Sequence, residues 1–129
     1  MKIVLYGNGG SGNHGCEAIV RGTFELLQES FLIASEAVEE DKKYGLEKWG
    51  DIYEAKTSKV NMVQLAKAYV KLKLTGNYTD MDGVPYLNFI DNVRGKADLA
   101  LSVGGDNYCY SNQSFYAFLN QAYQKKGIK

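Results

Sequence analysis

A glycine-rich loop near the N-terminus holds the residues whose types and spacing best suit the binding of an anion. Five glycines fall within residues 7–15, more than a tight turn requires. Glycine permits positive φ angles and close approach of the backbone to a ligand, and the loop leads into a predicted helix whose first amides and dipole attract negative charge. The alternative is that the glycines only let the chain turn into the helix. We predict an anion or nucleotide-sugar site with these binding residues: Gly7, Asn8, Gly9, Gly10, Asn13 and Gly15.

A second polar segment follows the apolar run at residues 98–103. Its candidate binding residues are Gly104, Gly105, Asp106 and Asn107. The aspartate could contact a ligand, or it could serve a turn or cap a helix by accepting hydrogen bonds from local amides. Nearby aromatic residues could offer a stacking surface to a sugar or base, and these are Tyr108, Tyr110, Phe115 and Tyr116.

Few side chains here could act as a catalytic acid or base. Glu17 and Asp106 are the candidates, although a glutamate in a first helical turn is equally explained by the helix dipole. His14 is the only histidine, which excludes any mechanism or metal site that needs two. Cys16 and Cys109 lack the spacing of a zinc site. We therefore expect free thiols, no metal and no cofactor.

The same loop also satisfies the dinucleotide-binding pattern G-x-G-x-x-G through Gly7, Gly9 and Gly12. Glu36 falls near the end of the second predicted strand, where an acid would contact a ribose. The first helix, however, is predicted to begin around residues 13–15, so Gly12 would precede the helix instead of packing it on the strand. An NAD(P)-binding oxidoreductase domain remains an alternative.

Apolar periodicity predicts the elements that position these loops. Short apolar runs at residues 2–6, 31–34 and 98–103 are typical of buried parallel strands. Helical spacing predicts four helices. The first covers residues 16–27, and the second lies around residues 62–70 and stops at Gly76. The third begins at Pro85 and ends before Gly95, and the fourth runs from residue 115 to Gly127. Residues 35–56 give no clear pattern.

These elements predict a Rossmann-like α/β fold, with three α/β/α layers and a parallel sheet. The second strand lies beside the first, and the long crossover of residues 35–97 can carry the third to the other side. The expected strand order is 2-1-3. Ligands of such sheets bind outside the carboxyl ends of the strands at the switch point, so both loops would face one crevice.

Composition bounds the remaining possibilities. The 129 residues are 45% hydrophobic and 23% charged, which suits a single globular domain over residues 1–129. Fifteen basic residues balance fifteen acidic ones, so no overall field favours nucleic acid. No signal-type apolar segment is found, and we expect a cytoplasmic protein.

Two segments resemble the N-terminal halves of polysaccharide pyruvyl transferases. Residues 13–19, Asn-His-Gly-Cys-Glu-Ala-Ile, are similar to the family pattern Asn-x-Gly-Asp-Glu-Ala-Ile, with Cys16 in place of an aspartate. Residues 98–106, Asp-Leu-Ala-Leu-Ser-Val-Gly-Gly-Asp, are similar to the family's second landmark. Both occur in the expected order, whereas the middle of the chain shows no match.

The resemblance implies a two-domain, GT-B-like enzyme of exopolysaccharide or cell-wall polymer synthesis that transfers pyruvyl from phosphoenolpyruvate to sugar hydroxyls. The acceptor would be a sugar, a nucleotide-sugar or a lipid-linked oligosaccharide, and the full-length protein could lie peripherally at the membrane. The basic residues for the donor would come from a C-terminal half, so we expect the chain to be an inactive fragment by itself. A non-enzymatic nucleotide-sugar-binding module is the other alternative.

Overall fold

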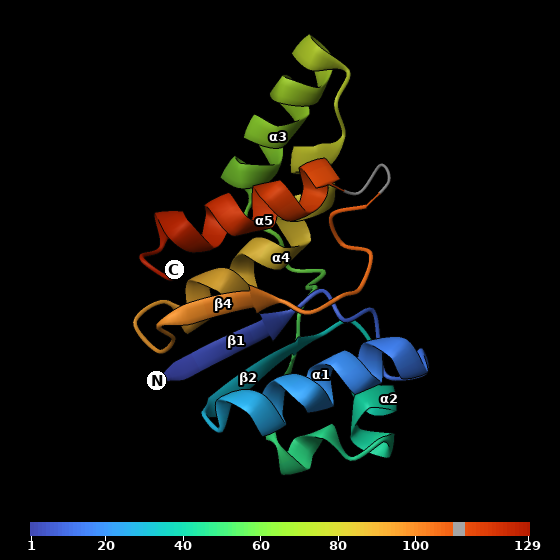
Figure 1. Cartoon of the computed structure of the whole chain (residues 1–129). Coiled ribbons are helices and arrows are strands. Elements are labelled where there is room, and N and C mark those ends of the chain that lie inside the picture. The colour runs from blue at the N-terminus through green and yellow to red at the C-terminus, as the bar shows by residue number, and fades with distance from the viewer. Residues whose placement is uncertain (110–112) are drawn as a thin grey trace.

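A four-stranded, fully parallel sheet forms the centre of the protein (Figure 1). The computed structural model describes residues 1–109 and 113–129. Along the sheet the strand order is β3-β2-β1-β4. The strands are β1 (Lys2–Tyr6), β2 (Ser30–Ser35), β3 (Gly50–Glu54) and β4 (Leu99–Ser102).

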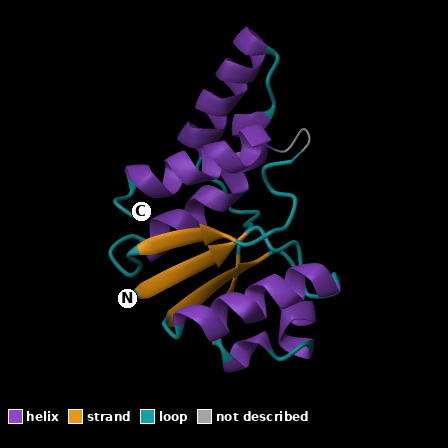
Figure 2. Ribbon diagram, viewed as in Figure 1, coloured by secondary structure: helices purple, strands orange, loops and turns teal. Residues whose placement is uncertain are grey.

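Helices cover both faces of this sheet (Figure 2). One face carries α1 (His14–Leu27), followed after β2 by α2 (Val38–Lys43) and the short 3-10 helix η1 (Leu46–Lys48). The other face carries α4 (Thr79–Val93) and α5 (Gln113–Lys125). The remaining helix, α3 (Met62–Thr75), packs on α4 and extends away from the sheet (Figure 1).

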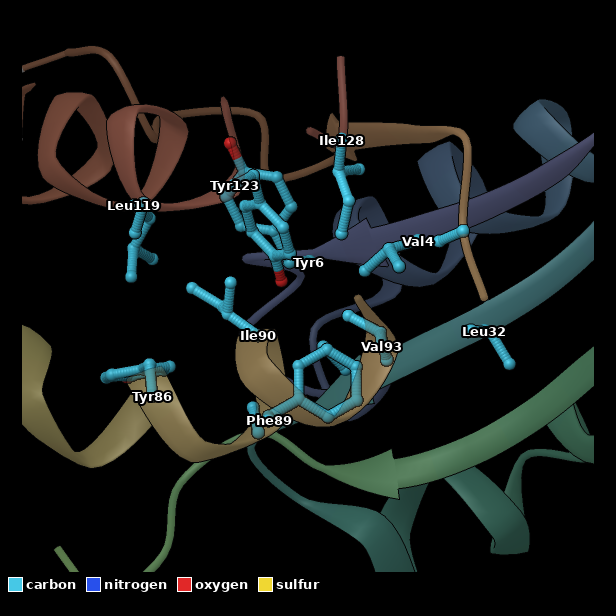
Figure 3. Packing of buried hydrophobic residues seen from close by; sticks show 14 residues of the cluster. Val4, Tyr6, Leu32, Tyr86, Phe89, Ile90, Val93, Leu119, Tyr123 and Ile128 are labelled. Carbon is cyan, nitrogen blue, oxygen red and sulfur yellow. The ribbon is translucent and has the colours of Figure 1, made fainter. Parts of the chain in front are cut away.

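The alternation of side chains along the strands explains the two hydrophobic cores. In β1, Ile3 and Leu5 point toward α1, whereas Val4 and Tyr6 point toward α4 and α5. Because both faces are covered, the strand is apolar at every one of these positions. On the α4–α5 face, the rings of Tyr6 and Tyr123 lie 5.0 Å apart between centroids (Figure 3).

Several predicted helix boundaries are confirmed by their caps. Asn13 caps α1 by accepting hydrogen bonds from the amides of Gly15 and Cys16. Gly76 ends α3 with a φ of 70°, a conformation that glycine adopts without strain. The start of α1 near residue 13 and the stop of α3 are therefore those predicted from the sequence.

The strand order differs from the predicted 2-1-3 because the sheet has a fourth strand. The first predicted strand does lie between the other two, as β1 between β2 and β4. The strand that was missed, β3, lies at the edge beside β2 and keeps most of its side chains partly or fully exposed. None of its residues is buried, so its sequence can carry Asp51 and Glu54 and lacks the apolar run that marks the other three strands.

The prediction that Pro85 opens a helix is wrong. Helix α4 begins at Thr79, and Pro85 lies inside it. Residues 79–84 are mostly polar or glycine and give little helical signal, but Gly83 packs against the ring of Phe118 in α5. Tertiary contact therefore extends this helix beyond the first-turn position that proline favours.

At the outer edge of β4, the amide of Ala100 donates to the carbonyl of Lys129 at 2.8 Å, and the Lys129 amide donates to the carbonyl of Asp98 at 3.1 Å. Over the described ranges, no helix has both the length and the apolar character needed to cross a membrane.

Candidate functional site

The two glycine-containing loops meet at the carboxyl ends of β1 and β4. Tyr6 and Ser102 are register partners, and the Val103 amide donates to the Tyr6 carbonyl at 2.9 Å. Gly7 has a φ of 79°. The chain leaves β1 toward β2 through α1 and later returns to β4 on the other side, so the loops lie at the topological switch point where such sheets bind ligands.

Asn107 joins the two loops. Its buried side chain lies between Gly7 and Gly104, where a Cβ atom on either glycine would collide with it. A Cβ on Gly104 would also collide with the Gly7 carbonyl oxygen. Asn107 Nδ2 donates to Ser102 Oγ. Gly7, Gly104 and Asn107, all predicted binding residues, therefore form the close contact between the loops. Glycine is required at positions 7 and 104 because there is no space for a side chain.

Two carboxylates of α2 accept hydrogen bonds from the N-terminal loop. The buried Asp41 accepts hydrogen bonds from the amide and hydroxyl of Ser11, at 2.9 and 2.5 Å, and from the hydroxyl of Ser35 at 2.5 Å. The Gly12 amide donates to Glu40 Oε1 at 2.5 Å. Two amides that could have held an external anion are thus bound to the protein's own carboxylates.

The start of α1 is similarly satisfied from within. Asn13 Oδ1 accepts from the amides of Gly15 and Cys16 at 3.0 and 3.4 Å. Glu17, the candidate acid, forms an ion pair with Arg21 at 2.7 Å and lies 3.2 Å from His14 Nδ1. In this conformation Asn13 acts as a helix cap and Glu17 as a surface ion-pair partner.

Asn8 differs from the rest of the loop because its hydrogen-bonding groups are free. The residue is 2% exposed, and within residues 1–109 and 113–129 neither Oδ1 nor Nδ2 has a partner. A buried amide without partners costs about 1–3 kcal/mol. Its neighbours Gly9 and Gly10 have positive φ angles, and Gly9 has open space around its Cα. Asn8 is therefore the loop residue whose side chain keeps free hydrogen-bonding capacity, and it is buried in this conformation.

On the second loop, Gly105 and Asp106 are exposed. The Asp106 carbonyl accepts from the Cys109 amide at 2.9 Å, which closes a turn. Gly105 approaches Ile19 of α1, since a Cβ built there would lie 3.4 Å from the Ile19 side chain. Asp106 thus stands at the open side of the switch point, where a solvent-borne ligand could reach its carboxylate.

A cluster of hydroxyl and amide groups beside β4 was not predicted from the sequence. The Tyr6 hydroxyl donates to Asn120 Oδ1, and Asn120 Nδ2 donates to the Tyr108 hydroxyl at 2.9 Å. Together with Ser102 they line a hollow of about 320 Å³ at the edge of the sheet. The sequence pointed to Tyr108 only as a stacking residue, and Asn120 stood out only as a polar residue amid the apolar positions of the last helix.

Two tyrosines of this cluster have pKa values moved in opposite directions. Burial raises the pKa of Tyr6 far above its ordinary value, with a further contribution from Tyr108. Burial also acts to raise the pKa of Tyr108, but hydrogen bonds with Tyr6, Asn120 and Ser102 outweigh it and lower that pKa. Tyr108 is thus a stronger acid than an ordinary tyrosine, a property often found at functional sites.

Glu36, the candidate ribose-binding acid, is already paired. Its carboxylate accepts from the Tyr86 hydroxyl at 2.9 Å and lies 3.1 Å from Lys56 Nζ. Burial and the neighbouring Glu36 charge raise the pKa of Tyr86, so this phenol remains a hydrogen-bond donor. A ribose would have to displace these contacts.

The candidate aromatic surface is partly assembled. Tyr108 and Tyr116 lie 5.9 Å apart between ring centroids, and Phe115 lies 5.1 Å from Tyr116. Tyr110 lies outside the described residues. Cys16 and Cys109 are free thiols, and within the part of the chain that is described no three His, Cys, Asp or Glu side chains gather as metal ligands.

Comparison with protein-family models, with curated proteins and with solved structures found no match. The family resemblance therefore rests on the residues of the two loops and on their spacing.

Proposed function

We propose that this chain is the N-terminal half of a polysaccharide pyruvyl transferase, which moves pyruvyl from phosphoenolpyruvate to sugar hydroxyls. The observation that carries the proposal is the contact of Gly7 with Gly104 and Asn107. The two segments that resemble the family are 91 positions apart, counted from Asn13 to Gly104, yet their loops form one wall at the switch point. GT-B-like placement beside a second half is part of the same proposal.

The reaction sets the chemical needs of the site. Protonation of the phosphoenolpyruvate CH2 carbon makes C2 electrophilic, and two sugar hydroxyls add there in turn while inorganic phosphate leaves. The products are a pyruvate ketal and phosphate, with no oxidant or reductant. The protein must supply a proton donor, a base for the hydroxyls, and cations for the donor's phosphate and carboxylate.

The described residues fit the acceptor side of such a site. Asp41 and Glu40 accept hydrogen bonds from the Ser11 and Gly12 amides, which are then not available to a phosphate. This supports an arrangement in which the donor's phosphate is held by basic residues of the other half. Asp106 offers an exposed carboxylate to sugar hydroxyls, whereas the Asn8 amide has no partner among the described residues but is buried in this conformation. Tyr108, with its lowered pKa, is the acid of this wall best suited to proton transfer.

The same contacts argue against the two alternatives. A dinucleotide-binding domain needs open loop amides for the pyrophosphate and a free acid for the ribose, whereas the Gly12 amide is bound to Glu40 and the Glu36 carboxylate to Tyr86 and Lys56. A nucleotide-sugar-binding module without catalysis would also need a diphosphate site. Both alternatives predict binding by the isolated chain.

The full-length gene product should be incubated with phosphoenolpyruvate and candidate sugar acceptors. Acceptor-dependent release of phosphate, together with acid-labile pyruvate on the sugar, is the expected result. Tyr108→Phe should lower kcat about 100-fold, whereas Tyr78→Phe, an exposed tyrosine outside the site, should not change it. The proposal would be refuted if the full-length protein consumed no phosphoenolpyruvate with any acceptor, or if the isolated chain bound NAD(H) tightly.

A further inference from the structure

Helix α3 has an apolar face that no part of the described chain covers. The helix packs through Ala68, which is buried, with Gln64 and Leu72 partly buried at the preceding and following turns. These residues are four apart and share one face. The opposite face exposes Val63 by 62%, Val70 by 56% and Leu74 by 81%. Met62 at the start of the helix is 72% exposed.

Lysines flank this apolar face on both sides. In projection down the axis at 3.6 residues per turn, Lys73 falls at one border of this face, at an angle between those of Met62 and Ala66, and Lys67 falls at the other border, next to Leu74. The Lys73 Nζ atom lies 5.4 Å from the centre of the Tyr69 ring. Lys71, farther round, pairs with Asp80 at 2.6 Å. The helix contains no acidic residue, although the chain as a whole has a formal net charge of zero.

The position of α3 leaves this face accessible. The helix packs on α4 and projects beyond the sheet and its covering helices (Figure 1). A wide, open hollow of about 610 Å³ runs along this face and is lined mainly by Met62, Val63, Ala66, Val70 and Leu74. Because it is bordered by one helix only and has no opposite wall, it suits a broad surface better than a peptide that needs an enclosed groove. Leu74, the most exposed apolar residue of the helix, lies near the projecting end.

We propose that α3 is a membrane-docking helix that binds an anionic lipid surface. An apolar stripe with lysines along its borders is the pattern of helices that lie in the headgroup region, where apolar side chains enter the lipid and lysines contact anionic headgroups. Pairing with a second copy would bring two lysine-bearing helices without acidic residues together, which their repulsion opposes. The proposal does not depend on the transferase function.

Sedimentation of the chain with vesicles provides the test. Phosphatidylcholine vesicles containing phosphatidylglycerol should bind the protein, and pure phosphatidylcholine vesicles should bind it far more weakly. The double variant Lys67→Gln/Lys73→Gln should bind about 30-fold more weakly to the anionic vesicles. Leu74→Ser, which removes an apolar group from the lipid, should weaken binding about tenfold.

Matched controls lie on the other side of the sheet. Leu26 of α1 is 84% exposed, much like Leu74, so Leu26→Ser controls for the loss of a surface leucine. Lys43→Gln/Lys48→Gln removes two exposed lysines of that side. Neither control should change binding, and circular dichroism should show that every variant is folded.

Four results would overturn the proposal. Absence of binding to anionic vesicles is the first, and equal loss of binding in the control variants is the second. The third is concentration-dependent dimerisation in lipid-free buffer that Leu74→Ser abolishes, which would assign the face to a second copy. Binding by an acidic peptide with no binding to vesicles would likewise replace the lipid with a protein partner.

Discussion

Replacing Asp41 by alanine should destabilise the protein through the glycine-rich loop. Asp41 is fully buried and joins three chain segments, because it accepts hydrogen bonds from the amide and hydroxyl of Ser11 and from the hydroxyl of Ser35. Ser11 and Ser35 are themselves buried. Asp41→Ala would therefore leave three buried donors, the Ser11 amide and the two hydroxyls, without their acceptor, whereas Ser35 Oγ would still accept from the Ala37 amide at 3.0 Å.

The structure gives the scale of this loss. Each unpaired buried group costs about 1–3 kcal/mol, and the three share one site, so their costs do not add fully. Removal of the carboxylate also removes the cost of burying it, which offsets part of the loss. We expect Asp41→Ala to lower the free energy of unfolding by about 4 kcal/mol. Asp41→Asn, which can still accept from Ser11 but not from Ser35, should lose about 2 kcal/mol.

Urea denaturation followed by circular dichroism measures these changes. With an m-value of roughly 2 kcal/mol/M, the midpoint for Asp41→Ala should fall by about 2 M. Glu39→Ala is the matched control, since Glu39 lies on the same helix with its side chain 91% exposed, and it should change stability by less than about 0.5 kcal/mol. A loss below about 1 kcal/mol for Asp41→Ala, or one equal to that of the control, would refute this account of the loop.

Three further variants test other parts of the structure. Gly104→Ala should lower stability by about 3 kcal/mol in urea denaturation, because the new methyl group collides with Asn107 and the Gly7 backbone; a neutral result would mean that the loops are not in contact. Gly22→Ala in α1 should raise stability by about 0.5–1 kcal/mol, since nothing lies within 4 Å of its added Cβ, and a loss would contradict the packing described. Burial raises the pKa of Tyr123, so its contribution to stability is complete below the unfolded value of about 10 and is lost as the pH rises above it. Tyr123→Phe should therefore make stability fall less steeply between about pH 10 and 12, and an unchanged slope would show that Tyr123 does not titrate in this way.

Local chemistry allowed the sequence to determine the framework of the fold. Apolar runs mark the strands β1 and β2, which are buried on both faces, and β4, which is half-buried at the sheet edge. Asn13 and Gly76 mark helix ends through caps that depend only on neighbouring residues. The placement of β1 between β2 and β4 followed from the length of the crossover. The candidate residues of both loops were identified for the same reason, since glycine density is visible in the sequence.

Tertiary structure alone decided which groups each candidate residue meets. Asp41 and Glu40 accept hydrogen bonds from the Ser11 and Gly12 amides only because α2 folds back beneath the loop. In the sequence these two residues belong to an acidic run, which does not indicate that their side chains bind the loop. Tyr6 and Asn120 are 114 positions apart in sequence, and their contact exists because α5 covers the face of β1. Helix α4 extends past Pro85 because Gly83 packs on Phe118. In each case the stabilising contact joins residues that are distant in sequence. No local sequence pattern predicts that such residues lie close together in the fold.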